Sequence, residues 1–252
     1  MPQAIYTIRG LTKSYGDNVV IDDLDFDVFS GESLVILGRS GSGKSVTLRQ
    51  LNGLEKPDSG SVVFEGTEIT TLDERDLFPL RRRVAMLFQS GALFDSGTVY
   101  DNVSFPLREH TDLDDNEITE IVDQKLAMVR LGGVEDLMPA DLSGGMKKRV
   151  ALARSLALDP EVVLFDEPTT GLDPMTGATI GHLIRSTQRD MKTTSVVVTH
   201  DIPLARLVGD RVAFLEGGRF SFIGSWPDAD RSEDPIFSRF LAGLEEEESH
   251  VA

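Results

Sequence analysis

The sequence predicts an α/β fold in which a parallel sheet is covered by helices on both faces. Short apolar runs of strand length occur at 33–37, 162–165 and 195–199, and each leads into a probable helix. Continuous apolar runs are typical of parallel strands, because both faces of such a strand are buried. Residues around 90–157 look mainly helical instead, so we expect a helical insertion in the sheet.

The N-terminal residues 5–28 predict an antiparallel pair of strands at a sheet edge. Apolar and polar residues alternate here on both sides of the turn Tyr-Gly-Asp-Asn at 15–18. Alternation with a period of two residues is typical of a strand that has one buried and one solvated face. We therefore expect a β-hairpin before the first parallel strand.

A glycine-rich loop lies between the apolar run 33–37 and a segment of helical spacing at 46–54. The loop reads Gly38-Arg39-Ser40-Gly41-Ser42-Gly43-Lys44-Ser45 and fits the pattern G-x-x-x-x-G-K-[ST]. Its small residues let successive backbone N–H groups turn inward around phosphate oxygens, and the next helix offers its positive end. We expect Lys44 to neutralise the β- and γ-phosphates of a nucleotide and the Ser45 hydroxyl to bind Mg²⁺.

The helical segment contains a clear helix start at Asp114. Asp114 and Glu117 have the spacing of a reciprocal N-terminal cap. The apolar residues that follow form one stripe at helical spacing: Ile118, Ile121, Val122, Leu126 and Val129. This stripe predicts an amphipathic helix.

Two carboxylates, Asp166 and Glu167, end the apolar run at 162–165. Taken alone, such a pair is often only a strand that meets solvent. In a chain that also carries a phosphate loop, it can place one acid near a metal ion and the other near an attacking water. We expect Asp166 to face Mg²⁺ and Glu167 to face the water.

Composition limits the class of protein. The chain has 252 residues, 40% of them hydrophobic, which suffices for one good core. No apolar run approaches the roughly 18 residues that cross a bilayer, and residues 1–10 lack the features of a signal peptide, so we expect a cytosolic protein. A formal net charge of −17 argues against nucleic acid as a partner. The chain has no cysteine, which excludes disulfides and thiolate metal sites.

The segment Leu142-Ser143-Gly144-Gly145-Met146 resembles the signature sequence of ABC ATPases. Other elements of that family occur in the expected order. They are Tyr15 in the place of an adenine-stacking aromatic, Gln89, Gly-Leu-Asp at 171–173, and His200 after the third apolar run. Each is unremarkable alone, but together and in register they identify the chain as similar to this family over residues 5–225.

The resemblance implies a P-loop NTPase fold: a RecA-like parallel-sheet core with an antiparallel edge subdomain, plus a helical lobe specific to ABC proteins. It also implies that 1–252 is a single ABC ATPase domain. Within it, 1–89 and 158–225 would form the core, 90–157 the helical subdomain, and 226–252 a C-terminal tail.

The resemblance assigns a role to individual residues. Lys44, Glu167 and His200 would be catalytic, and Ser45, Gln89 and Asp166 would attend Mg²⁺. The residues that would bind ATP are Tyr15, Gly38, Arg39, Ser40, Gly41, Ser42, Gly43, Lys44, Ser45, Val46, Gln89, Ser143, Gly144, Gly145, Asp166 and Asp173. In this family Ser143 and Gly145 of one subunit close over the nucleotide of a second copy. ATP would therefore close a head-to-tail dimer, and hydrolysis would reopen it.

Several stretches resemble the Mla and Mce branch of bacterial lipid transporters within this family. They are 88–96, 99–103, 105–109, 234–235 and 239–243, together with 142–149, where methionine rather than the commoner glutamine stands at 146. The implied partners are integral-membrane permease subunits of the Mla type and an Mce-domain lipid-binding protein, and a small regulatory subunit is a further candidate. The protein would then work at the cytoplasmic face of the inner membrane, attached through the permease, whose cytoplasmic helix lies in a groove near Gln89. An ABC ATPase of a different importer or exporter, or one outside transport, is the alternative.

The tail after Trp226 leaves two interpretations open. Ile236, Phe237, Phe240 and Leu241 would line one face of a helix. That face either docks on a neighbouring subunit or packs on its own domain. The acidic run at 245–248 is expected to be a solvated terminus.

Overall fold

A six-stranded sheet forms the centre of the computed structural model, which describes residues 3–243. The strands lie in the order β10-β9-β3-β8-β7-β6, all parallel except β10. Their bounds are β3 Ser33–Leu37, β6 Val84–Leu87, β7 Val162–Asp166, β8 Thr194–Thr199, β9 Arg211–Glu216 and β10 Arg219–Ser225. The predicted parallel sheet is confirmed, and each predicted apolar run forms one of its inner strands.

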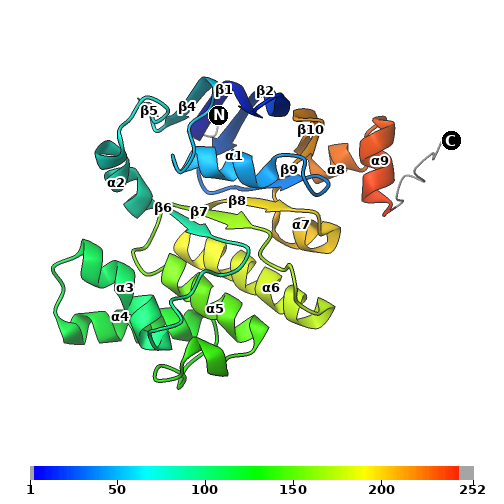
Figure 1. Cartoon of the computed structure of the whole chain (residues 1–252). Helices are drawn as coiled ribbons and strands as arrows, with labels where there is room; N and C mark the ends of the chain where they lie inside the picture. The colour runs from blue at the N-terminus through cyan, green and yellow to red at the C-terminus, as the bar shows by residue number, and fades with distance from the viewer. Residues whose placement is uncertain (1–2, 244–252) are drawn as a thin grey trace.

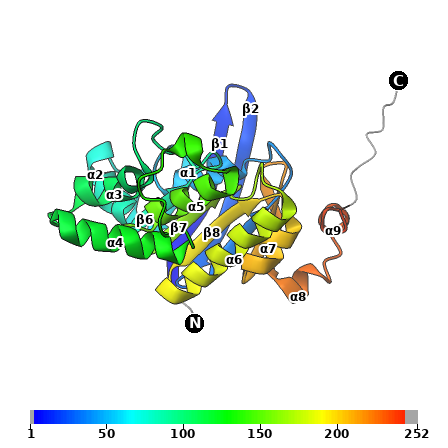
Figure 2. The ribbon, with the colours of Figure 1, turned by 90° about the horizontal axis from the view of Figure 1, so that it is seen from below.

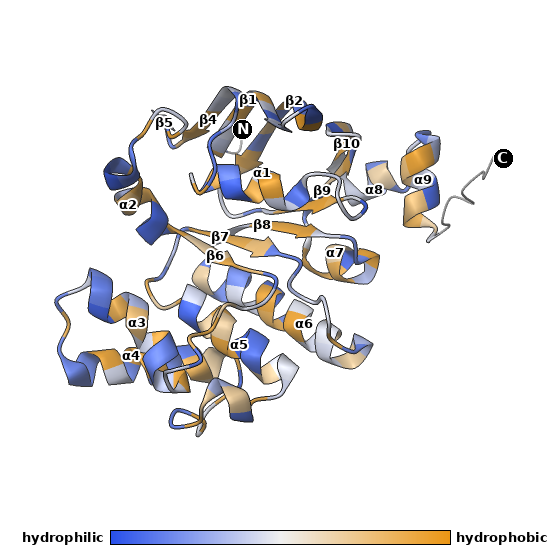
Figure 3. Ribbon diagram, in the orientation of Figure 1, coloured by the Kyte–Doolittle hydropathy of each residue, from blue (hydrophilic) through white to orange (hydrophobic). Residues whose placement is uncertain are grey.

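The sheet is buried on both faces, because consecutive side chains of its strands point to opposite sides. Val35 and Leu37 belong to the core beneath the sheet, and Leu34 and Ile36 belong to the core above it. Below lie α5 (Gly144–Ser155), α6 (Pro174–Met191) and α7 (Ile202–Val208), and above lies α1 (Lys44–Leu51), as Figure 1 shows. Figure 3 shows the hydrophobic character of β7 and β8 between these two layers.

A second, antiparallel sheet covers α1 from above, in the strand order β2-β1-β4-β5. Its strands are β1 Ala4–Tyr15, β2 Asn18–Phe29, β4 Ser59–Phe64 and β5 Thr67–Glu68. The predicted hairpin is confirmed: β1 pairs with β2, and Tyr15 lies opposite Asn18 at the turn. The short helix α2 (Glu74–Arg83) joins this sheet to β6.

The predicted helical segment, around 90–157, contains α3 (Val99–His110), α4 (Asp115–Met128) and α5. Helices α3 and α4 pack beside α5 at one end of the molecule (Figure 2), and a 3-10 turn at Pro139–Asp141 precedes α5. The reciprocal cap of Asp114 and Glu117 is present, and the predicted apolar stripe packs into the lower core. Within residues 3–243, no helix is both long and apolar enough to span a membrane.

The two short helices α8 (Trp226–Ala229) and α9 (Pro235–Leu241) end the described chain. Phe237 is fully buried, and its ring stacks on Phe214 and on Phe222, with centroids 4.9 Å apart in both cases. Phe240 also contacts Phe214. Of the two interpretations of this helix, the structure therefore supports packing on its own domain. The acidic run at 245–248 lies outside the described residues.

Candidate active site

Four of the predicted motifs meet at one edge of the parallel sheet. The phosphate loop follows β3, Asp166 and Glu167 end β7, His200 follows β8, and Gln89 follows β6. These strands are neighbours in the order β3-β8-β7-β6 and run in the same direction. Because the carboxyl ends of parallel strands meet at the same edge, the sheet gathers motifs that lie far apart in sequence.

Lys44 is held inside the curve of the phosphate loop. Its ammonium donates hydrogen bonds to the main-chain oxygens of Gly38 and Arg39, both at 2.8 Å, and lies 3.5 Å from Glu167 Oε1. Burial lowers the pKa of Lys44, and the charges of Glu167 and Asp166 oppose that shift. An anion bound in the loop would add to those charges and favour the ammonium form.

The backbone of the loop requires glycine at specific positions. A Cβ on Gly38 would lie 2.5 Å from the main-chain oxygen of Leu215. Gly43 has a φ of 101°, and its Cβ would lie 2.8 Å from the oxygen of Val20. Ser42 Oγ is buried and, among residues 3–243, finds no hydrogen-bond partner. A phosphate oxygen in the loop would satisfy that hydroxyl, so the loop fits an anionic ligand.

Ser45 and Asp166 form a pair of oxygen ligands beside the loop. The Ser45 hydroxyl donates to Asp166 Oδ1 at 2.7 Å, although 121 residues separate them in sequence. A hydroxyl and a carboxylate are hard donors of the kind that Mg²⁺ prefers. Gln89, the third predicted metal residue, is exposed, and in the described chain no contact joins its side chain to this pair.

Glu167 is held in a fixed position at the end of β7. Its backbone has a φ of 46°, a strained conformation that costs about 1–3 kcal/mol for a residue other than glycine. Thr199 donates to its Oε2 at 3.2 Å, and His200 Nδ1 lies 3.1 and 3.0 Å from its two carboxylate oxygens. No sequence motif indicates this role for Thr199. Its position directly before His200, at the end of β8, was the available signal.

Other predicted residues do not join this edge of the sheet within one chain. Ser143 caps α5 by accepting a hydrogen bond from the Met146 N–H at 3.3 Å. A Cβ on Gly145 would lie 2.5 Å from Thr176 Cγ2, so the signature segment packs on the start of α6. Asp173 caps that helix, and a hydrogen bond from Thr176 lowers the pKa of its carboxyl. These residues form a second cluster, in which a Cβ on Gly144 would lie 3.6 Å from Leu172 Cδ2.

Tyr15 contacts Glu55 and Lys13 in the single chain. Its side chain is 48% exposed at the end of β1, and its hydroxyl donates to Glu55. The ammonium of Lys13 lies 5.6 Å from the centre of its ring. The exposed ring leaves a surface on which a flat heterocycle could stack.

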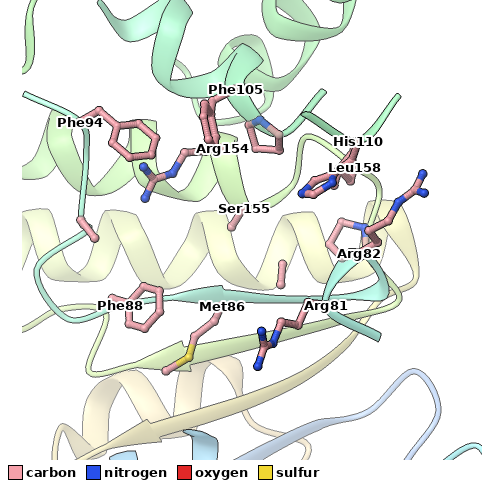
Figure 4. A pocket seen from close by; sticks show the side chains of 14 residues that line it. Arg81, Arg82, Met86, Phe88, Phe94, Phe105, His110, Arg154, Ser155 and Leu158 are labelled. Atoms are coloured by element: carbon pink, nitrogen blue, oxygen red, sulfur yellow. The ribbon is translucent and has the colours of Figure 1, made fainter. Parts of the chain in front are cut away.

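A groove of about 370 Å³ opens between the sheet and the helical segment (Figure 4). Exposed rings of Phe88, Phe94 and Phe105 line it, and the last two have centroids 4.8 Å apart. Basic side chains surround these rings: Arg81, Arg82, His110 and Arg154. An apolar surface with a basic rim suits a partner that is apolar and acidic.

Known proteins resemble the chain over most of its length. A sequence model of the family described as ABC transporter matches residues 21–170. The chain is 42% identical to the probable ribonucleotide transport ATP-binding protein mkl of Mycobacterium leprae, a match that covers 96% of this chain and 70% of that protein. It is 40% identical to the intermembrane phospholipid transport system ATP-binding protein MlaF of Haemophilus influenzae, with coverage of 96% and 92%. It spans about two thirds of the mycobacterial relatives.

A solved structure shares the fold closely. It is the dimeric, post-hydrolysis state of the ATP-binding cassette MJ0796 bound to ADP and Pi. The TM-score is 0.81 at 32% identity, over 87% of this chain and 98% of that one. The predicted fold class and the predicted similarity to this kind of protein are both confirmed.

Proposed function

Because this chain belongs to the ABC transporter family, we propose that it hydrolyses ATP at the edge of the parallel sheet and so drives a membrane partner. This proposal rests on side chains that lie close together at the ends of β3 and β7: Lys44 beside Glu167, and Ser45 bonded to Asp166. Residues 38–46 would hold the triphosphate, and Tyr15 would stack on the adenine. Residues 90–157 would act as a helical lobe on a core formed by 1–89 and 158–225.

Mg²⁺ fits this site through Ser45 and Asp166, with Gln89 as the third proposed ligand. When bound, the ion would neutralise phosphate oxygens and the charge that develops on them. Lys44 would add a positive charge on the side of the loop. Its bonds to Gly38 and Arg39 hold the ammonium in place before the nucleotide binds.

Glu167 is the proposed base for the attacking water. It is buried beside Lys44, while Thr199 and His200 restrict the orientation of its carboxylate. A base must lie in a fixed position relative to the proton that it accepts, and the strained backbone of Glu167 contributes to that position. His200, whose side chain is 60% exposed, would contact the γ-phosphate.

The complete site is proposed to form between two copies of the chain. Ser143, Gly145 and Asp173 form a cluster of their own in the single chain, with Ser143 and Asp173 exposed to a partner. In a head-to-tail dimer this cluster would close over the nucleotide on the opposite copy. ATP would favour the closed dimer, because only in that state does it contact both the phosphate loop of one copy and the Ser143 cluster of the other. Hydrolysis would remove ATP and so reopen the dimer.

Ser143→Arg tests this arrangement. We expect ATP binding to stay within about twofold of the wild type, because Ser143 does not contact the phosphate loop of its own chain. The steady-state rate should fall by about a hundredfold, because the bulky cation blocks closure. Calorimetry and phosphate release measure the two quantities. Ser186→Arg, on α6, is the matched control. An undiminished rate of ATP hydrolysis in Ser143→Arg would show that the site is not shared between two copies of the chain.

The proposed cargo is phospholipid or a related lipid, in line with the MlaF relatives and the stretches at 88–96 and 99–109. The groove beside Gln89 would receive a cytoplasmic helix of a permease, whose acidic and apolar side chains would meet Arg81, Arg82 and the three phenylalanines. An Mce-domain protein and a small regulatory subunit are further proposed partners. The protein would then work at the cytoplasmic face of the inner membrane, attached through the permease.

Purification of the protein with its native membranes in mild detergent, followed by mass spectrometry, tests the proposed partners and cargo. We expect a permease, an Mce-domain protein and bound phospholipid to co-purify. Phe105→Asp should lower permease recovery about tenfold, since it places an acid among basic and apolar groups that would contact the partner. Phe78→Asp, an exposed phenylalanine outside the groove, is the matched control. A different permease, a nucleotide cargo or an assembly without a membrane protein would overturn the lipid assignment and leave the ATPase site untouched.

A further inference from the structure

Helix α5 holds the segment around Gln89 with two cations, the buried Lys148 and the partly buried Arg154. Lys148 donates a hydrogen bond to the main-chain oxygen of Gln89, and Arg154 donates one to the oxygen of Gly91 at 2.9 Å. Between these bonds, a Cβ on Gly91 would lie 3.4 Å from Cβ of Ala151, so the backbone runs close along the helix. The helix that starts at the signature segment therefore fixes the segment that follows β6.

The two cations face different surroundings. Lys148 is only 6% exposed. Burial lowers the pKa of its ammonium, and the negative charges of Asp166 and Glu167 oppose that shift. Burial also lowers the pKa of Arg154, which lies over the ring of Phe94 in the groove, 5.4 Å from its centre. Lys148 therefore interacts electrostatically with the candidate active site, while Arg154 faces the proposed partner surface.

We propose that Lys148 is a positioning residue of the ATPase site, which anchors Gln89 and sets the charge that Asp166 and Glu167 present to Mg²⁺. The inference rests on the proposed function, because it assumes that these carboxylates serve a metal-dependent site. The charge of a buried cation that interacts with two buried carboxylates partly cancels theirs, and burial makes this effect stronger than at a surface. Lys148 would thus lower the affinity of the nucleotide-free site for a divalent cation. It would also favour the release of Mg²⁺ after turnover.

Loss of Lys148 has two opposing effects on Mg²⁺ binding. Release of Gln89 would weaken it, whereas removal of the positive charge would strengthen it. We expect the charge to dominate, because it acts on two buried carboxylates, whereas Gln89 is a neutral ligand on an exposed loop. The direction of the change therefore separates an electrostatic role from a purely structural one.

The experiment measures the Mg²⁺ concentration that gives half-maximal binding of a fluorescent ATP analogue to the full chain. In Lys148→Met we expect this concentration to fall by roughly tenfold, and in Lys148→Arg to stay near the wild type. Arg154→Met is the matched control, since it removes the other anchor of the same loop without changing the charge near Asp166. Its Mg²⁺ requirement should not fall: it should stay at the wild-type value or rise, because the segment that carries Gln89 loses an anchor while the charge near Asp166 is unchanged. Hydrogen exchange over residues 88–94 should rise in both methionine variants, which reports the loss of anchoring and requires no nucleotide.

An unchanged or raised Mg²⁺ requirement in Lys148→Met would overturn the inference. So would an equal fall in Arg154→Met, because the loop alone would then explain it. Wild-type protein that bound ATP without any dependence on Mg²⁺ would overturn the proposed metal site together with this inference. If ATP binding by the wild type depends on Mg²⁺ as expected but Lys148→Met has the same Mg²⁺ requirement, only the inference about Lys148 is overturned.

Discussion

Glu167→Gln is expected to keep ATP affinity near that of the wild type and to lose turnover by at least about a hundredfold. The amide has the size of the carboxylate and can still bond to Thr199, but it cannot accept a proton from water. Because closure would depend on ATP and reopening on hydrolysis, the variant should also accumulate as an ATP-bound dimer. Phosphate release in a single turnover measures the chemical step, and size-exclusion chromatography with ATP measures the dimer.

Glu161→Gln provides the matched control for that variant. Glu161 stands directly before β7, at the opposite end of the strand from Glu167, where it pairs with Arg83. The same chemical change at this end should leave turnover close to the wild type. Rapid hydrolysis by Glu167→Gln would remove Glu167 from its proposed role and direct the search for the base to His200.

Lys44→Ala is expected to lower ATP affinity by about a hundredfold or more, which corresponds to about 3 kcal/mol of binding free energy. The variant removes a buried ammonium that two loop carbonyls hold in place, and with it the charge that would face the phosphates. It also leaves Glu167 without its nearby counter-ion, so the repulsion between the Glu167 carboxylate and the triphosphate should increase. Isothermal calorimetry with ATP and Mg²⁺ measures the change.

Lys192→Asn is a suitable control for loss of one ammonium. Lys192 is exposed at the end of α6 and has a φ of 55°, a conformation that asparagine tolerates. We expect its ATP affinity to match the wild type. Normal ATP affinity in Lys44→Ala would contradict the proposed phosphate-binding role of residues 38–45.

Local features of the fold were predictable because short-range physics controls them. The caps at Asp114 and the apolar runs at 33–37 and 162–165 depend on neighbours in sequence, and the structure has a helix or a strand at each of them. The apolar face of α9 was also predictable. What it packs against was not, because Phe214 and Phe222 reach Phe237 only through the order of the strands in the sheet.

The candidate site divides in the same way. By itself the sequence determined the phosphate loop, the paired carboxylates and the family, since these depend on residue types at close spacing. The tertiary structure alone decided that Ser45 meets Asp166, that Thr199 restricts Glu167, and that Lys148 reaches Gln89. Such contacts depend on which strands are neighbours and on how α5 packs beneath them. That arrangement comes from burial of the whole core, which no local pattern of residues records.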